Sequence, residues 1–494
     1  MSAEAPAKLP ETAGQGVMAS ARWPMWAALA LALLSCLPVL VARYPQMTDY
    51  PAHLARYHVM LEIGHNAALA RYYAFDWWWS GNLGADLLIR PLTALVGLEN
   101  AGRLIAGVIP PLTGLGIVAV EWALRRRIGV GTFLAFAFIW SPSMLLGFLN
   151  FTLSLSLALF AFAGWVLLQG KSWRPLVFLP AALLVWLCHV SGWGILGLMV
   201  FGYEWSRSKS LSAFLAPWPL TLPVLPLLFG SGTKGVVSYG AYVHIYKMAI
   251  WGKAMRDHIE WLDRGSLYLV GGAVLLALAF RRIDWRLGWG ALIVCLGSLA
   301  MPRHIAGGDY ADYRMISSGL MLACMAIDWR VPRAVLLLAP ALFLARLGVT
   351  TADWQRDSQA FAGMLPALDH VPHGARVASA VAVRRGGWAF DPFEHVGGYA
   401  VFRRDALSNM NFALPHVHML RLREGGPGFA DPSQRVFHKV GTPLDLSTFA
   451  PAAQADWLWY VGAAEPAKLP PGAVIVWRGQ GSLLARLANS PHRR

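Results

Sequence analysis

The segment 48–53, Thr-Asp-Tyr-Pro-Ala-His, brings an acid and a histidine together around a proline that suits the first turn of a helix. In such a helix Asp49 and His53 lie on one side of the first turn, and Arg56 lies one turn further on. A carboxylate placed there can take the proton of a hydroxyl group, and the basic side chains can stabilise negative charge nearby. Asp49 is equally suited to cap the helix, and His53 alone is typical of a surface histidine, so these structural roles stay open.

A second polar group lies in the segment 301–314, between two apolar stretches. Its ionisable members are Arg303, His304, Asp309, Asp312 and Arg314. Arg314 stands at the head of an apolar stretch, where a guanidinium group can bind two phosphate oxygens at once. The alternative is an interfacial arginine that pairs with Asp309 or Asp312 and reaches toward the membrane surface.

The composition indicates a membrane in which these residues must be positioned. Of 494 residues, 56% are hydrophobic and 14% are charged, whereas globular chains carry roughly 25% charged residues. The net charge of +15 is explained better by basic cytoplasmic loops than by a nucleic-acid partner, and no nucleic acid is expected. The four cysteines lie in apolar runs without a CxxC pair, which argues against structural disulfides and a cysteine-bound metal.

Apolar stretches of about 15 to 25 residues predict membrane-spanning helices, eleven in number. Their connections alternate in charge, because one set holds twelve basic residues against three acidic ones, and this places the N-terminus in the cytoplasm. His189 lies at an outer turn, where an ionisable group is either functional or packs between helices. The predicted spans are 24–42, 100–124, 128–141, 146–168, 175–188, 190–204, 211–230, 266–280, 287–301, 315–328 and 334–349.

This orientation divides the chain into three parts. Residues 1–23 form a cytoplasmic N-terminus, and residues 24–349 form a transmembrane domain. The large outer loops of that domain are 43–99 and 231–265. Residues 350–494 are less apolar and contain strand-like runs between Gly/Pro-rich turns, so we expect a soluble extracytoplasmic α/β domain.

The layout and the motif together resemble the GT-C superfamily of integral-membrane glycosyltransferases. An acid follows the first span on a horizontal helix of a long outer loop, and about ten further spans and an outer tail come after it. The segment 48–53 looks like the Asp-x-Pro-x-His variant of many bacterial members. The resemblance implies a GT-C-like fold in a bacterial inner membrane and transfer of a sugar from a polyprenyl-phosphate donor to an envelope lipid, glycan or protein at the outer face.

The resemblance also implies roles for individual residues. Asp49 would be the catalytic residue that activates or orients the acceptor. The candidates for binding the donor and its phosphate are His53, Arg56, His189, Arg303, His304 and Arg314. Many GT-C enzymes carry a second acid in the next outer loop, but residues 141–146 contain none. Asp76, Asp86 and Asp309 are the candidates to replace it, and the need for a divalent metal such as Mg²⁺ or Mn²⁺ stays open.

Other functions compete with this interpretation. A secondary transporter or flippase of envelope precursors is the main one, although no inverted repeat is evident and charged residues inside the spans are few. An O-antigen polymerase or ligase also has many spans, but its main loop normally comes late in the chain. The sequence contains no Walker loop, no GxGxxG after a strand and no GxSxG elbow. Nucleotide-driven transport and α/β-hydrolase chemistry therefore lack support.

Overall fold

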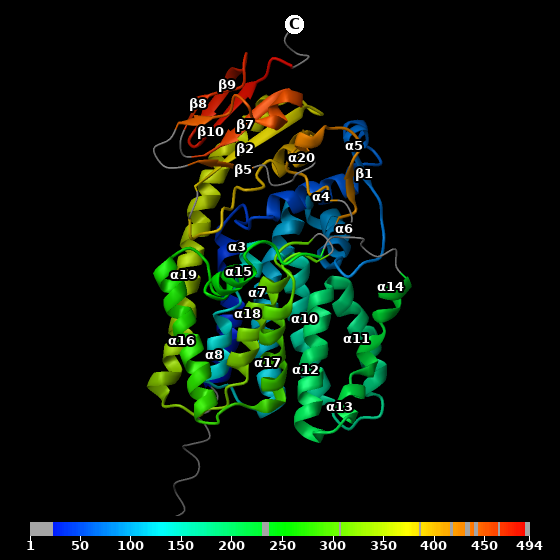
Figure 1. The fold of residues 1–494 in the computed structure, drawn as a ribbon, viewed down its shortest axis with the longest axis vertical. Helices are drawn as coiled ribbons and strands as arrows, with labels where there is room; N and C mark the ends of the chain where they lie inside the picture. The colour runs from blue at the N-terminus through cyan, green and yellow to red at the C-terminus, as the bar shows by residue number, and fades with distance from the viewer. Residues whose placement is uncertain are drawn as a thin grey trace, which may run out of the picture.

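The computed structural model describes residues 23–229, 237–305, 308–384, 387–414, 418–429, 435–438, 443–462 and 465–489. A bundle of helices makes up one end of the molecule, and a small sheet makes up the other (Figure 1). Nearly all of the predicted cytoplasmic N-terminus and the start of the predicted outer loop 231–265 lie outside the described residues.

Long apolar helices form the core of the bundle. Among the described residues, five helical segments are long and apolar enough to cross a membrane: Trp23–Val41, Leu98–Arg125, Leu149–Leu167, Glu260–Ala279 and Arg333–His370. They contain α2 (Trp23–Leu34), α3 (Leu37–Val41), α7 (Leu98–Arg125), α10 (Leu149–Leu167), α16 (Glu260–Ala279), α19 (Arg333–Met364) and the short helix η3 (Leu365–His370).

Small residues allow α7 to pack closely between α2 and α10. A Cβ atom at Gly114 would lie 2.8 Å from the Cβ of Ala32, and one at Gly116 would lie 2.9 Å from the Cβ of Leu159. Close approach of helix backbones at glycine is typical of helices packed within a membrane, where burial of apolar side chains gains little.

The predicted number of eleven spans is not confirmed. The apolar helices α11 (Arg174–Cys188) and α17 (Trp285–Ala300) are shorter than a full span. The stretch 128–141 contains only one short helix, α8 (Val130–Phe136). The stretch 211–230 is broken into α13 (Ser212–Leu215), η2 (Trp218–Thr221) and α14 (Val224–Phe229), because its prolines lack the N–H group that a continuous helix needs. The other helices of the bundle are α9 (Pro142–Leu145), α12 (Val190–Ser208), α15 (Val243–Trp251) and α18 (Ala311–Met325).

The first outer loop contains the helix that the proline predicts. This helix, α4 (Tyr50–Glu62), packs against α6 (Gly84–Val96), α7 and α20 (Gly398–Arg404), and most of its residues are buried. The C-terminal part of the chain covers one side of this helix through α20. The loop also contains α5 (Ala67–Tyr72) and β1 (Tyr73–Phe75), which pairs with β4 (Leu420–Leu422) of the tail.

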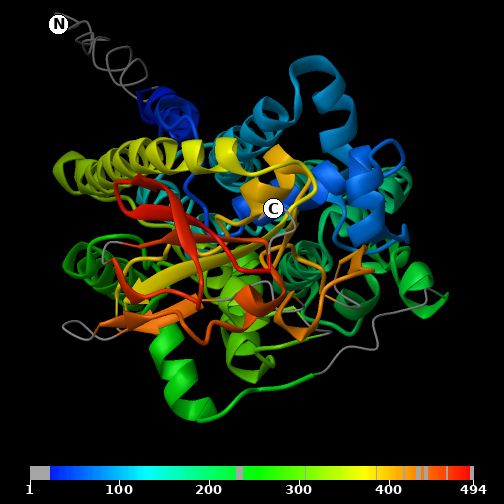
Figure 2. The same ribbon diagram turned by 90° about the horizontal axis from the view of Figure 1, so that it is seen from above.

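The tail contains the predicted strands in a mixed sheet. Its order is β3-β2-β7-β10-β9, and β5 also pairs with β2. The central strand β2 runs parallel to β3, β5 and β7, whereas β10 is antiparallel to β7 and β9. Seen from above, the sheet lies over the helix bundle (Figure 2). The strands are β2 (Arg376–Arg384), β3 (Leu407–Ser408), β5 (Arg435–His438), β7 (Trp457–Val461), β9 (Val474–Gly479) and β10 (Ser482–Arg486), with β6 (Leu444–Asp445) paired to β8 (Pro466–Lys468).

Candidate active site

Asp49 lies directly before α4, and the second outer loop holds its backbone. The Asp49 N–H donates to the Leu146 carbonyl at 2.9 Å, and the Thr48 N–H donates to the Leu145 carbonyl at 3.3 Å. Gly147 has a φ of +91°, and a Cβ atom there would lie 3.2 Å from the Cβ of Asp49. The Asp49 side chain makes no capping hydrogen bond to α4, so the capping role is not observed and the carboxylate faces other groups.

A histidine from the tail is one of these groups. The Nδ1 of His395 lies 3.4 Å from Oδ1 of Asp49 and 3.1 Å from the Thr48 carbonyl oxygen. The His395 side chain is only 5% exposed, whereas that of Asp49 is 17% exposed and so remains reachable. His395 is therefore placed to orient the carboxylate, part of which stays exposed.

The electrostatic surroundings strengthen Asp49 as a base. Burial raises the pKa of Asp49 well above its usual range, and the neighbouring carboxylate of Glu394 raises this pKa further. Arg314 opposes the rise, and Asp309 adds a smaller contribution in the same direction as Glu394. The site therefore combines a carboxylate of high proton affinity with one nearby guanidinium group.

Arg314 lies in the first turn of α18, on the inner side of this site. Its guanidinium carbon lies 4.2 Å from the ring centroid of Phe148, and its buried Nε has no hydrogen-bond partner among the described residues. Arg314 is close enough to act electrostatically on both Asp49 and His189. It can thus offer an N–H group to an anion beside Asp49.

His189 is the N-terminal cap of α12. Its Nδ1 accepts the Ser191 N–H at 3.0 Å, which leaves the proton of the neutral ring on Nε2. The ring meets Phe151 edge-on at 5.5 Å. His189 therefore has a structural role in starting α12, and it also lies near Arg314.

His53 joins α4 to the second outer loop. Its Nε2 lies 3.2 Å from the Gly147 carbonyl oxygen, so the neutral ring can donate to it. Burial, assisted by the nearby charge of Arg56, lowers the pKa of His53 to about 3. A neutral His53 positions the loop beside Asp49 and supplies no positive charge for a phosphate.

Arg56 is committed to a buried ion pair. Both terminal nitrogens meet the carboxylate of Asp86, and the side chains are 4% and 0% exposed. Asn150 donates to the same carboxylate at 3.2 Å. This pairing argues against the predicted contact of Arg56 with a phosphate, and it engages Asp86, one of the candidates for the second acid.

Some of the ionisable side chains of the segment 301–314 pair with one another. Arg303 makes two hydrogen bonds to Asp309, at 2.7 and 2.9 Å, and Nδ1 of His304 lies 3.4 Å from the same carboxylate. The pairing with Asp309 that was the alternative for Arg314 is therefore made by Arg303. Asp309 and Asp76 were the other candidates for the second acid. Asp309 contributes to the raised pKa of Asp49, whereas Asp76 pairs with Arg421 beside the β1–β4 ladder.

Sequence reasoning missed Glu394 and His395. They lie in the tail, some 345 positions after Asp49, and only the folding of the tail over α4 brings them to it. The local signal is a Glu-His pair inside a largely uncharged run before α20. Among the described residues no three His, Cys, Asp or Glu side chains gather as a metal-ligand set, so the divalent metal stays a prediction.

Comparison with known proteins identifies the fold. No protein-family model and no curated protein matches the chain. The fold is similar to the crystal structure of ArnT from Cupriavidus metallidurans in the apo state, a GT-C glycosyltransferase. The TM-score is 0.51 over 94% of this chain and 98% of that chain, at 12% sequence identity. The chain therefore has the fold of this GT-C enzyme over nearly its whole length, as the resemblance implied.

Proposed function

We propose that this GT-C chain is a membrane glycosyltransferase that moves a sugar from a polyprenyl-phosphate donor to an envelope lipid, glycan or protein. The observation that carries the proposal is the pairing of a base with a free cationic donor. Asp49 is released from helix capping and has a raised pKa, and Arg314 lies beside it with a hydrogen-bond donor that has no partner in the described structure.

This arrangement fits a single displacement at the anomeric carbon. The acceptor hydroxyl oxygen forms the new bond to that carbon while Asp49 takes the hydroxyl proton. The bond between the anomeric carbon and the phosphate oxygen breaks, and the polyprenyl phosphate leaves with its electron pair. Arg314 meets the negative charge that develops on the phosphate, with the Nε2–H of His189 as a further donor.

The location of the site suits such substrates. A sugar on a polyprenyl phosphate stays at the bilayer surface. Asp49 directly precedes α4, which lies between the helix bundle and the sheet (Figure 1). The arginine-rich connections lie at the opposite end of the bundle, which supports a cytoplasmic N-terminus and an extracytoplasmic tail in a bacterial inner membrane. An acceptor would then arrive from outside the cell.

The test is mass spectrometry of envelope glycolipids and glycans from a strain that lacks this chain. The strain is complemented with wild type, Asp49→Asn or Asp76→Asn at matched membrane abundance. We expect a sugar mass that depends on the wild type, survives Asp76→Asn and falls by about 10²- to 10⁴-fold with Asp49→Asn. Asp76→Asn is the control because it removes an exposed carboxylate of the same loop. Equal profiles for all three proteins would reject the proposal and favour a transporter or flippase.

A further inference from the structure

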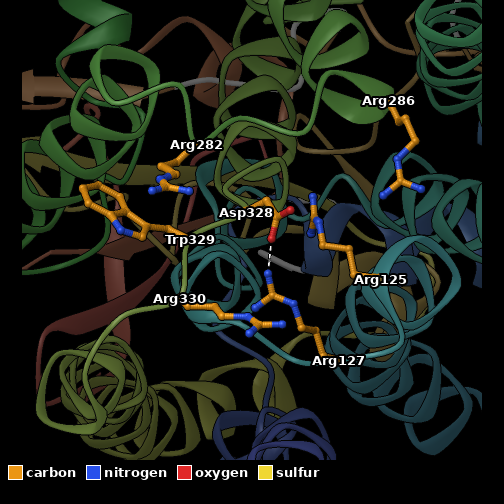
Figure 3. Close-up of a pocket in the computed structure, with 7 residues that line it drawn as sticks. All are labelled: Arg125, Arg127, Arg282, Arg286, Asp328, Trp329 and Arg330. Atoms are coloured by element: carbon orange, nitrogen blue, oxygen red, sulfur yellow. Dashed lines mark hydrogen bonds and ion pairs between the residues drawn. The ribbon is translucent and has the colours of Figure 1, made fainter.

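A concavity lies at the end of the helices farthest from the sheet. Its volume is about 610 Å³, and three connections between helices form its wall. They are the segment after α7, the α16–α17 connection and the α18–α19 connection. The lining residues are Arg125, Arg127, Arg282, Arg286, Asp328, Trp329 and Arg330, several of which point toward a common centre (Figure 3). We call this concavity the arginine pocket.

Carboxylates neutralise only part of the positive charge of the five arginines that line the arginine pocket. Arg125 pairs with Glu121 and Asp284, and Arg286 pairs with Asp284 at 2.8 Å. Arg127 pairs with Asp328. Five arginines thus face three carboxylates, which leaves a surplus of two positive charges.

The surplus is located on two exposed residues. Within the described part of the chain, neither Arg282 nor Arg330 has a carboxylate within ion-pairing distance. They belong to different connections, and both line the arginine pocket, on either side of Trp329 in the view of Figure 3. Arginines that serve only to orient a membrane protein need to lie in the cytoplasmic loops, but they need not come together in one pocket.

The floor of the pocket carries a further incomplete interaction. The Arg125 side chain is 3% exposed, and its buried Nη2 has no hydrogen-bond partner among the described residues. A buried donor without an acceptor is costly, and native structures rarely keep one. An anionic oxygen that reaches the floor would supply the acceptor.

We propose that the arginine pocket binds a phosphate-bearing anion. Guanidinium groups bind phosphate oxygens in pairs, and a surplus of two charges matches a phosphate dianion. The volume lies within the range of about 300–1,000 Å³ that is usual for small-ligand sites. The pocket borders the ends of two span-length helices, Leu98–Arg125 and Glu260–Ala279, which is the level of lipid phosphates. The shared chemistry is a phosphate group, which either a lipid headgroup or a soluble phosphate ester can present.

The test measures binding of two probes to the full-length protein. Inorganic pyrophosphate is titrated by calorimetry, and phosphatidic acid is compared with phosphatidylcholine by native mass spectrometry. The pocket variant is Arg282→Gln/Arg330→Gln, whose residues are exposed. The control is Arg126→Gln/Arg281→Gln, which removes the same charge from neighbouring positions that do not line the pocket.

We expect the pocket variant to weaken binding by about tenfold or more, and the control to bind like wild type. Loss for phosphatidic acid alone identifies a lipid headgroup as the ligand, and loss for pyrophosphate alone identifies a soluble anion. Equal binding by both variants, or no binding of either probe to wild type, would overturn the proposal. Since the arginine pocket is remote from Asp49, neither result depends on glycosyl transfer.

Discussion

At the scale of single residues, the neighbours of Asp49 set the pH at which it can act as a base. Its pKa is raised by burial and then by Glu394, so the ionised form requires a higher pH than an exposed aspartate would. Activity that needs the ionised form is lost as the pH falls through this raised pKa. We therefore expect Glu394 to shift the acidic limb of the pH profile to higher pH.

Glu394→Gln tests this relation. Removing the carboxylate lowers the pKa of Asp49, so the acidic limb of transfer activity should shift to lower pH. The measurement is the rate of sugar transfer in membranes across a pH series. Glu424→Gln, which changes the exposed partner of Arg71, should leave the limb in place. A limb that stays fixed in Glu394→Gln, or moves to higher pH, would contradict the assignment of Asp49 as the base.

The buried pair of Arg56 and Asp86 makes a different prediction, on stability. Arg56→Gln leaves a buried carboxylate without its partner and should cost about 3–5 kcal/mol of unfolding free energy. Arg56→Met/Asp86→Leu should recover most of it, because an apolar pair needs no charge compensation. The exposed pair of Arg71 offers the control, since Arg71→Gln should cost about 0–1 kcal/mol.

Denaturant unfolding in detergent measures these differences. A variant Arg56→Gln that keeps its stability and loses only transfer would show that Arg56 binds substrate, as the sequence suggested. The observed ion pair predicts instead that Arg56→Gln loses stability, and that any loss of transfer activity follows from this.

At the scale of elements, the second outer loop contacts the backbone and side chain of Asp49 beside Gly147. Gly147→Ala introduces a Cβ atom 3.2 Å from the Cβ of Asp49, at a left-handed φ of +91°. Gly170→Ala has a similar backbone cost, since its φ is +80°, but nothing lies within 4 Å of its added Cβ. A displacement of about 1 Å at a reacting group can cost roughly 10²-fold in rate.

We therefore expect Gly147→Ala to lose most transfer activity at unchanged membrane abundance, and Gly170→Ala to stay near wild type. Both are measured by the same transfer assay after normalising for folded protein. Equal losses in the two variants would mean that backbone strain, and not contact with Asp49, explains the effect.

The elements also show what could be predicted from sequence. The proline-initiated helix and the strands of the tail were predicted because proline position and strand composition are local signals. The stretch 128–141 forms the short helix α8 and not one continuous helix, because apolar composition alone does not determine where a helix ends. The pairing of Arg56 with Asp86 and the approach of His395 to Asp49 depend on packing between distant segments, which spacing along the chain does not encode.

At the scale of the whole molecule, the tail completes the site by docking on the first outer loop. His58 contacts Asp405 at 2.8 Å, and the Tyr72 hydroxyl donates to the Gly374 carbonyl at 2.6 Å. Strand β1 pairs with β4, and α20 lies against α4. The docked tail brings Glu394 and His395 to Asp49, so docking and catalysis should be lost together.

Gly398→Ala tests this dependence. A Cβ atom at Gly398 would collide with the Pro51 carbonyl group, so α20 must move away from α4 and take His395 from Asp49. Gly363→Ala is the matched control, because the long helix α19 leaves open space at that position. We expect Gly398→Ala to lose transfer activity and to expose the first outer loop to limited proteolysis, while Gly363→Ala does neither. Activity that persists after the loop becomes cleavable would show that Asp49 works without the tail, and the role assigned to His395 would then fail although the base itself would stand.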